Sequence, residues 1–180
     1  QVIGTWGGID LVMIVAGTHT SMSAKTIDLP RATRLFEVNV MGVLNCLDAV
    51  LPQLLTQDRG GVAIVSSVAG YRGLPKALIY GPTKAALINL AESLYLDLGP
   101  RGLGVYLVNP GFVDTPLTQK NDFRMPALIP ADEAARLTLK GIADGEFEIH
   151  FPKRFTRILR LLRTLPYPAY FAAVRRFTGT

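Results

Sequence analysis

Short apolar runs alternate along the chain with longer segments whose apolar residues recur at helical spacing. The short runs, which have the length of buried strands, lie at residues 9–17, 62–65, 105–108 and 147–151. The helical segments lie at residues 31–55, 77–98 and 131–143. Strands separated by helices of this length predict an α/β fold, with a parallel sheet built from right-handed crossovers and flanked by helices. We expect the first strand, at residues 11–15, to be buried on both faces.

The ends of the predicted strands carry small and polar residues. Ala16-Gly17 ends the first strand, Ser66-Ser67 the second and Asn109-Pro110-Gly111 the third. In an open parallel sheet, ligands bind beyond the carboxyl ends of the strands. The sequence therefore predicts a binding site along this one edge of the sheet.

The composition indicates one globular domain. The chain has 180 residues, of which 49% are apolar and 18% charged, and its mean hydropathy is +0.28. These values exclude a disordered chain and a disulfide scaffold. With Cys46 the only cysteine and His19 and His150 the only histidines, we expect no metal site, a packed core position for Cys46 and a polar loop position for His19. No uninterrupted apolar stretch approaches the roughly 18 residues of a membrane span, which favours a cytoplasmic location.

The net charge of +5 comes from the end of the chain. The last thirty residues carry seven of the 19 basic residues and no acid, which leaves 12 bases against 14 acids in residues 1–150. We therefore divide the chain into a main part, residues 1–152, and a basic helical tail, residues 153–180. In 153–165, bases alternate with Phe155, Ile158, Leu159, Leu162 and Leu165. Such a helix either packs on the domain or makes peripheral contact with a membrane; nucleic-acid binding is not expected.

Tyr80 and Lys84 are the first candidates for chemistry. They are four residues apart at the start of a predicted helix, so they share one face. A tyrosine hydroxyl is a poor base at neutral pH, and a neighbouring ammonium lowers its pKa and makes it a usable proton donor or acceptor. Alone, the pair is weak evidence, because a pair of this kind also arises by chance on an exposed helix.

Four motifs together change this interpretation. Asn39-x-x-Gly42, the strand-end Ser67, Tyr80-x-x-x-Lys84 and Pro110-Gly111-x-x-x-Thr115 follow one another in this order. In these motifs the sequence resembles the short-chain dehydrogenase/reductase family over roughly residues 9–150. The resemblance implies a Rossmann-like, partly doubly wound fold and an oxidoreductase that uses NAD or NADP to interconvert a ketone and a secondary alcohol. The spacing to Tyr80 selects Ser67 over its neighbour Ser66.

The resemblance also implies roles for the catalytic residues. Tyr80 would be the general acid in reduction and the base in oxidation. Ser67 would hydrogen-bond the substrate oxygen and stabilise the charge that develops there. Lys84 would hold the cofactor ribose and lower the pKa of Tyr80, and Asn39 would position a water that relays protons to Lys84.

The remaining implied residues contact the cofactor. Ala16 and Gly17 would give backbone clearance over the adenosine ribose. Pro110 and Gly111 would let the chain approach the cofactor closely. The Val113 backbone and the Thr115 hydroxyl would then fix the nicotinamide carboxamide. The family also implies a homo-oligomer formed through the helices that bear Asn39 and Tyr80.

The sequence departs from the family pattern near its start. Val15 stands where the family usually has an asparagine, and no glycine-rich phosphate loop precedes residue 9. At roughly 30 residues per βαβ unit, about 60 residues of the family domain are expected to be missing. This leaves the choice between NAD and NADP open, and predicts that the 180-residue chain is inactive as it stands. The alternative is a truncated, non-catalytic protein of the same fold that acts through surface contacts.

The segment between residues 112 and 130 is where the family shapes its substrate pocket. Its apolar residues are Leu117, Phe123, Met125, Leu128 and Ile129. They favour a hydrophobic carbonyl or alcohol substrate if they line the pocket. If they instead pack the segment on the core, they say nothing about the substrate.

Overall fold

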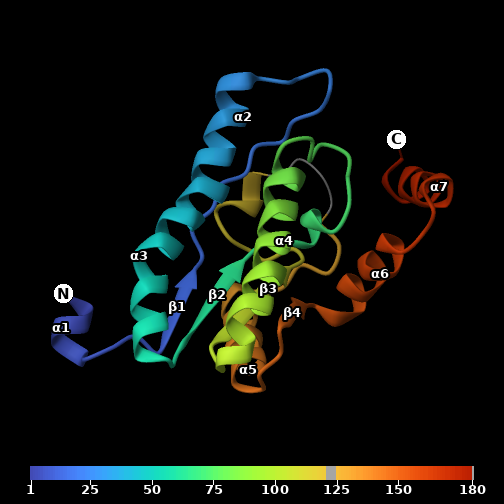
Figure 1. The fold of residues 1–180 in the computed structure, drawn as a ribbon. Coiled ribbons are helices and arrows are strands. Elements are labelled where there is room, and N and C mark those ends of the chain that lie inside the picture. The colour runs from blue at the N-terminus through green and yellow to red at the C-terminus, as the bar shows by residue number, and fades with distance from the viewer. Residues whose placement is uncertain (121–124, 180) are drawn as a thin grey trace.

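The computed structural model describes residues 1–120 and 125–179, in which four parallel strands form one sheet (Figure 1). The strands are β1 (Leu11–Ile14), β2 (Gly61–Val65), β3 (Gly104–Pro110) and β4 (Glu148–Phe151), and their order in the sheet is β1-β2-β3-β4. The predicted parallel α/β fold is therefore confirmed. All four strands end at the same edge, because each pair is parallel.

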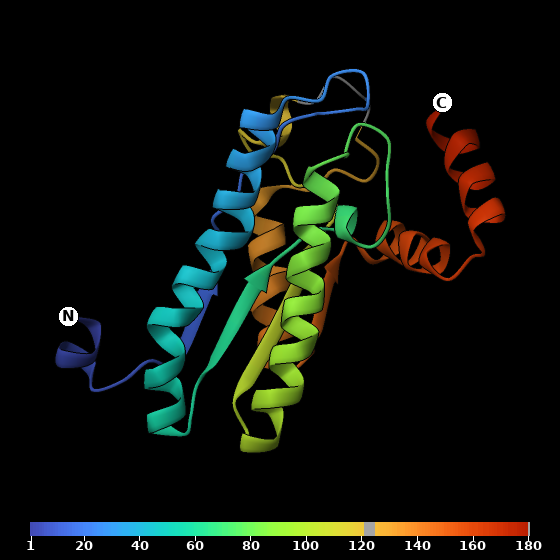
Figure 2. The same cartoon turned by 45° about the horizontal axis from the view of Figure 1, so that its top comes forward.

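Helices cover both faces of this sheet (Figures 1 and 2). On one face lie α2 (Leu29–Phe36), η1 (Glu37–Met41) and α3 (Gly42–Gln57), which run as one continuous helix, and α4 (Tyr80–Leu98). On the other face, α5 (Ala131–Ala143) packs against β3 and β4. The remaining helices are α1 (Val2–Trp6), the short turns η2 (Val68–Gly70), η3 (Gly99–Arg101) and η4 (Thr118–Lys120), and the tail helices α6 (Lys153–Arg163) and α7 (Tyr167–Thr178).

The larger core lies between the sheet and α3 and α4. Its strand residues include Val62 and Ile64, both fully buried, and Leu87 of α4 packs against them. A smaller core under α5 contains Val108 and Ile149. The near-continuous apolar sequence of β2 follows from this arrangement, because β2 is buried on both faces.

The expectation that the first strand is buried on both faces is wrong for β1. Met13 remains 39% exposed and Val15, just after the strand, 61% exposed. Among the described residues β1 pairs only with β2, at the edge of the sheet, and on the α5 side the helix contacts β3 and β4. Burial on both faces, predicted from the apolar sequence, is therefore not found for β1 in residues 1–120 and 125–179.

The continuous helix Leu29–Gln57 is long and apolar enough, by length and composition, to cross a membrane, contrary to the expectation from uninterrupted apolar runs. Core helices of water-soluble domains meet the same criteria. In this helix Val43, Leu47 and Leu54 are buried against the sheet. Cys46 lies on the other side and is exposed, so its predicted place in the core is also wrong.

Candidate active site

The predicted catalytic residues meet at the carboxyl edge of the strands. Ser67 follows β2, Tyr80 opens α4, and Asn39 lies in η1 of the neighbouring long helix. The sequence from Ser67 to Tyr80 leaves the sheet edge as η2 and a loop, and then returns to begin α4 (Figure 2). Residues far apart in the sequence are thereby brought to one place.

Ser66 and Ser67 have different partners in the structure. The buried Ser66 donates its hydroxyl proton to the carbonyl oxygen of Lys84, at 2.7 Å, and so fastens β2 to α4. Ser67 caps η2, where its Oγ accepts from the backbone N–H of Ala69 at 3.1 Å, and its side chain interacts with Tyr80 in the direction that lowers the pKa of the tyrosine. Ser67 is therefore the serine that faces the tyrosine.

Gly70 is the residue that brings η2 close enough to α4 for this contact. A Cβ on Gly70 would lie 2.6 Å from the carbonyl carbon of Lys84 and 2.8 Å from the backbone nitrogen of Ala85. Real Cβ atoms do not approach backbone so closely, and the helix backbone cannot yield as a flexible side chain would. Only glycine fits here without separating η2 from α4, a requirement that sequence reasoning missed.

The pKa of Tyr80 is raised by burial, while its hydrogen bond with Ser67 acts in the opposite direction. The expectation of a lowered pKa is therefore wrong in sign for this structure. The Lys84 ammonium lies 5.8 Å from the centre of the Tyr80 ring and donates to the carbonyl oxygen of Val65 at 3.0 Å. Burial lowers the pKa of Lys84 to about 8. The site thus keeps the tyrosine protonated at neutral pH.

Asn39 is fully buried, and its amide holds the loop that follows β1. Its Oδ1 accepts from the N–H of Thr18 at 2.7 Å, and its Nδ2 donates to the Thr18 carbonyl at 2.9 Å and to Thr83 Oγ1 at 3.1 Å. Thr83 in turn donates to the carbonyl of Tyr80. Asn39 lies in a π-helical turn, a feature frequently found at functional sites. Its predicted role in a proton relay stays a prediction.

His19 is a site residue that sequence reasoning placed in a polar loop. Its ring meets the Tyr80 ring edge-on, with 4.7 Å between the ring centres and 89° between the planes. Burial lowers its pKa, which favours the neutral imidazole. The signal in the sequence was its position two residues after the strand-end Gly17.

The structure fits a nucleotide at Ala16 and Gly17, which are exposed at the end of β1. A Cβ on Gly17 would lie 3.5 Å from Lys84 Nζ and 3.6 Å from Asn39 Oδ1, so these polar atoms border the same space. Val65 takes one of the three ammonium protons of Lys84, and donors remain for the hydroxyls of a ribose.

The residues after β3 that were predicted to contact the cofactor make hydrogen bonds and packing contacts within the protein. Pro110 ends β3, and the N–H of Gly111 donates to the Phe151 carbonyl at 2.8 Å. A Cβ on Gly111 would lie 3.1 Å from the Phe155 ring, so a side chain here would press on the first turn of α6. Val113 forms a bridge with Ile129, and its carbonyl accepts from Thr118 Oγ1. The Thr115 hydroxyl lies 3.3 Å from the same Thr118 oxygen.

The apolar residues considered for the substrate pocket divide between core and surface. Ile129 is buried in the core under α5, Leu128 is 42% exposed, and Leu117 and Met125 are half-buried. Phe123 lies outside the described residues. Ile129 therefore packs on the core, while the other described members of this group keep exposed surface.

Comparison with known proteins shows which family the chain belongs to. The sequence model described as short chain dehydrogenase matches residues 1–125. The chain belongs to the short-chain dehydrogenase family. An uncharacterized oxidoreductase of Myxococcus xanthus is 40% identical over 170 residues, which cover 94% of this chain and 67% of that protein. Human 17-beta-hydroxysteroid dehydrogenase 13 is 28% identical over 163 residues, covering 89% of this chain and 54% of that protein.

Solved structures of short-chain dehydrogenases show the same fold. One from Burkholderia cenocepacia J2315, in complex with NADP, superposes with a TM-score of 0.84 at 24% identity, covering 96% of this chain and 74% of that one. Another, from Sphingobium yanoikuyae and in complex with NADPH, superposes with a TM-score of 0.74 at 24% identity, covering 83% of this chain and 61% of that one. The chain spans 59% of an uncharacterized oxidoreductase of Staphylococcus epidermidis, to which it is 34% identical.

Proposed function

We propose that residues 1–152 form the catalytic part of an NAD(P)-dependent oxidoreductase that reduces a ketone to a secondary alcohol, or the reverse, on an apolar substrate. The observation that carries this proposal is the placement of Ser67 after β2 and of Tyr80 at the start of α4, with the ammonium of the buried Lys84 lying 5.8 Å from the centre of the Tyr80 ring. Family membership and the NADP-bound structural neighbours support the cofactor class.

In carbonyl reduction, Tyr80 donates its hydroxyl proton to the substrate oxygen, and Ser67 hydrogen-bonds that oxygen as negative charge develops on it. Burial supports the acid role, because it raises the pKa of Tyr80 and keeps the phenol protonated. Lys84 holds positive charge near the ring, and Asn39 fixes the loop after β1 against α4. When bound, the nicotinamide supplies the hydride.

The cofactor would lie against Ala16 and Gly17, with Lys84 holding its ribose. We retain Val113 and Thr115 as contacts for the carboxamide, with Pro110 and Gly111 fixing the turn before them. These assignments follow the family pattern, and the space bordered by Gly17, Lys84 and Asn39 supports the first of them.

A homo-oligomer and a cytoplasmic location belong to the same proposal. The long helix and α4 leave large apolar side chains exposed, among them Met41 at 51%, Leu44 at 37% and Leu96 at 74%. Pairing of these helices with a second copy would bury them. Light scattering at micromolar concentration tests this, and a monomeric mass would contradict it.

The Tyr80→Phe variant tests the proposed activity. In a full-length version of the protein, which also carries the family's nucleotide-binding part, reduction of ketones with NADH or NADPH should fall by about 10²–10⁴-fold, the contribution of general acid catalysis. Nucleotide binding, measured by calorimetry, should stay nearly unchanged. Tyr95→Phe is the matched control, because Tyr95 lies on the same helix and is 48% exposed. Near-normal turnover in Tyr80→Phe would contradict the proton-donor role of Tyr80. Absence of turnover in the unmodified full-length protein would instead favour the alternative, a non-catalytic protein that acts through surface contacts.

A further inference from the structure

The outward side of α6 carries both cationic and apolar side chains. Arg154, Arg157, Ile158 and Leu161 follow the spacing of one helix face, and all four are exposed. Ile158 is 55% and Leu161 68% exposed. The apolar residues that hold α6 on the domain are different ones, Phe155 and Leu159, which pack against the main core.

The same combination continues on α7. Tyr170 and Val174 are buried, whereas Tyr167 is 67% and Phe171 48% exposed, with Arg175 four residues further along the same side. We call the exposed residues of the two helices the tail surface. They are Arg154, Arg157, Ile158, Leu161, Tyr167, Phe171 and Arg175. In both views α6 and α7 lie beyond β4, at the side of the molecule away from α1 (Figures 1 and 2).

The cations of the tail surface are free to meet an external anion. Three tail bases are paired within the protein, Lys153 with Glu146, Arg160 with Glu148 and Arg163 with Glu92. Within residues 1–120 and 125–179, no carboxylate pairs with the arginines of the tail surface. The tail itself supplies no acid.

We propose that the tail surface docks on a membrane that carries anionic lipids. Exposed aliphatic and aromatic side chains gain by entering the interfacial region, while the interleaved arginines extend to the lipid headgroups. A nucleic acid would pair with the arginines but would leave Ile158 and Leu161 without an apolar partner. A second copy would set one acid-free cationic surface against another, which like charges oppose. Charge and apolar surface together therefore favour lipid.

The tail surface is held at a fixed position relative to the candidate active site. Arg72 lies in the segment between Ser67 and Tyr80, and its Nη1 donates to the carbonyls of Leu162 at 3.2 Å and Leu165 at 2.6 Å, at the end of α6. Its guanidinium lies 4.1 Å from the centre of the Tyr170 ring, and the Tyr170 hydroxyl donates to the Gly73 carbonyl at 2.6 Å.

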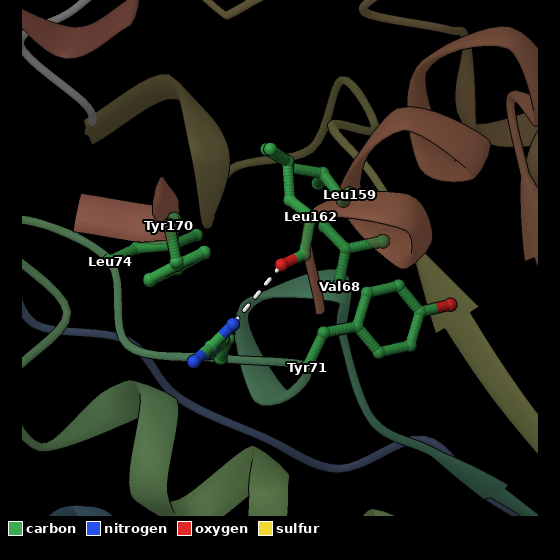
Figure 3. Close-up of a pocket in the computed structure, with 7 residues that line it drawn as sticks. Val68, Tyr71, Leu74, Leu159, Leu162 and Tyr170 are labelled. Carbon is green, nitrogen blue, oxygen red and sulfur yellow. Dashed lines mark hydrogen bonds between the residues drawn. The ribbon is translucent and has the colours of Figure 1, made fainter. Parts of the chain in front are cut away.

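Apolar contacts line the same junction. Figure 3 shows Val68 and Tyr71 of the η2 region facing Leu159 and Leu162 of α6 around a small cavity. A docked tail would thus hold the substrate side of the enzyme next to the bilayer, an arrangement that suits an apolar substrate. This last consequence rests on the proposed function, whereas the docking itself does not.

Vesicle flotation in a density gradient tests the docking without any enzymatic assay. The chain should float with phosphatidylcholine vesicles that contain phosphatidylserine, float much less with phosphatidylcholine alone, and be released by high salt. Arg154→Gln with Arg157→Gln should lower the partition coefficient roughly 30-fold, since each base near an anionic surface contributes about 1 kcal/mol. Ile158→Ser with Leu161→Ser should also lower it, at unchanged charge.

The matched control is Arg31→Gln with Arg34→Gln, which removes the same charge from exposed positions on α2. This control should float like the unmodified chain, and circular dichroism should show that all variants are folded. Equal flotation of the α6 variants and the unmodified chain would overturn the proposal. So would flotation that is indifferent to lipid charge, a tail-dependent change of mass without flotation, or tight duplex DNA binding lost in the arginine variant alone.

Discussion

Replacing Gly70 by alanine should loosen the contact that holds Ser67 beside Tyr80. The added Cβ would lie 2.6–2.8 Å from three backbone atoms of α4, about 0.8 Å inside ordinary van der Waals contact. Overpacking of this kind costs about 1–3 kcal/mol. The cost at Gly70 should lie toward the upper end, because the neighbouring atoms are backbone and cannot move aside as a side chain would. The loss of chain entropy in the unfolded state offsets about 0.4–1 kcal/mol. The net destabilisation should be about 2 kcal/mol.

Urea denaturation followed by circular dichroism measures this loss. With a slope of about 2 kcal/mol per molar, the midpoint should fall by about 1 M. Gly73→Ala is the control, because a Cβ on Gly73 meets nothing within 4 Å and its backbone is not left-handed. Gly73→Ala should leave the midpoint unchanged or slightly raised. If Gly70→Ala unfolds at the same urea concentration as the control, η2 can move away from α4 freely, and the argument that packing fixes Ser67 fails.

Three further predictions concern buried polar groups. Burial lowers the pKa of His150, whose Nε2 faces Arg160, so stability should fall as the pH drops below about 6.5. In urea titrations above and below pH 6.5, the His150→Gln variant should lose less stability on acidification than the unmodified chain. An equal loss of stability would contradict this. Because the pKa of Lys84 is about 8 in the folded state, stability should rise between pH 8 and about 10, and Lys84→Met should lack this rise in the same assay. Asn39→Ala removes the side-chain partners of the Thr18 N–H and carbonyl and should lower the free energy of unfolding by about 2 kcal/mol. A loss below about 0.5 kcal/mol in urea denaturation would show that Asn39 does not hold the loop after β1.

Most of the fold could be predicted because its signals are local. The period of apolar residues found the four strands, and α5 lies at residues 131–143 as predicted. The predicted helix at 77–98 begins at Tyr80 in the structure, since the preceding residues form a turn. α1 was not predicted, because Val2–Trp6 is too short to show a period and buries no residue.

The sequence by itself determined the order of strands and helices and the candidate residues Ser67, Tyr80 and Lys84, because periodicity and motif spacing are properties of neighbouring positions. Only the tertiary structure decided which side chains touch and how deeply they are buried. It set the edge-on contact of His19 with Tyr80 and the need for glycine at position 70. It also gave Tyr80 a raised pKa, since desolvation depends on everything packed around a group. Burial and close approach arise from segments far apart in the chain, and no local pattern records them.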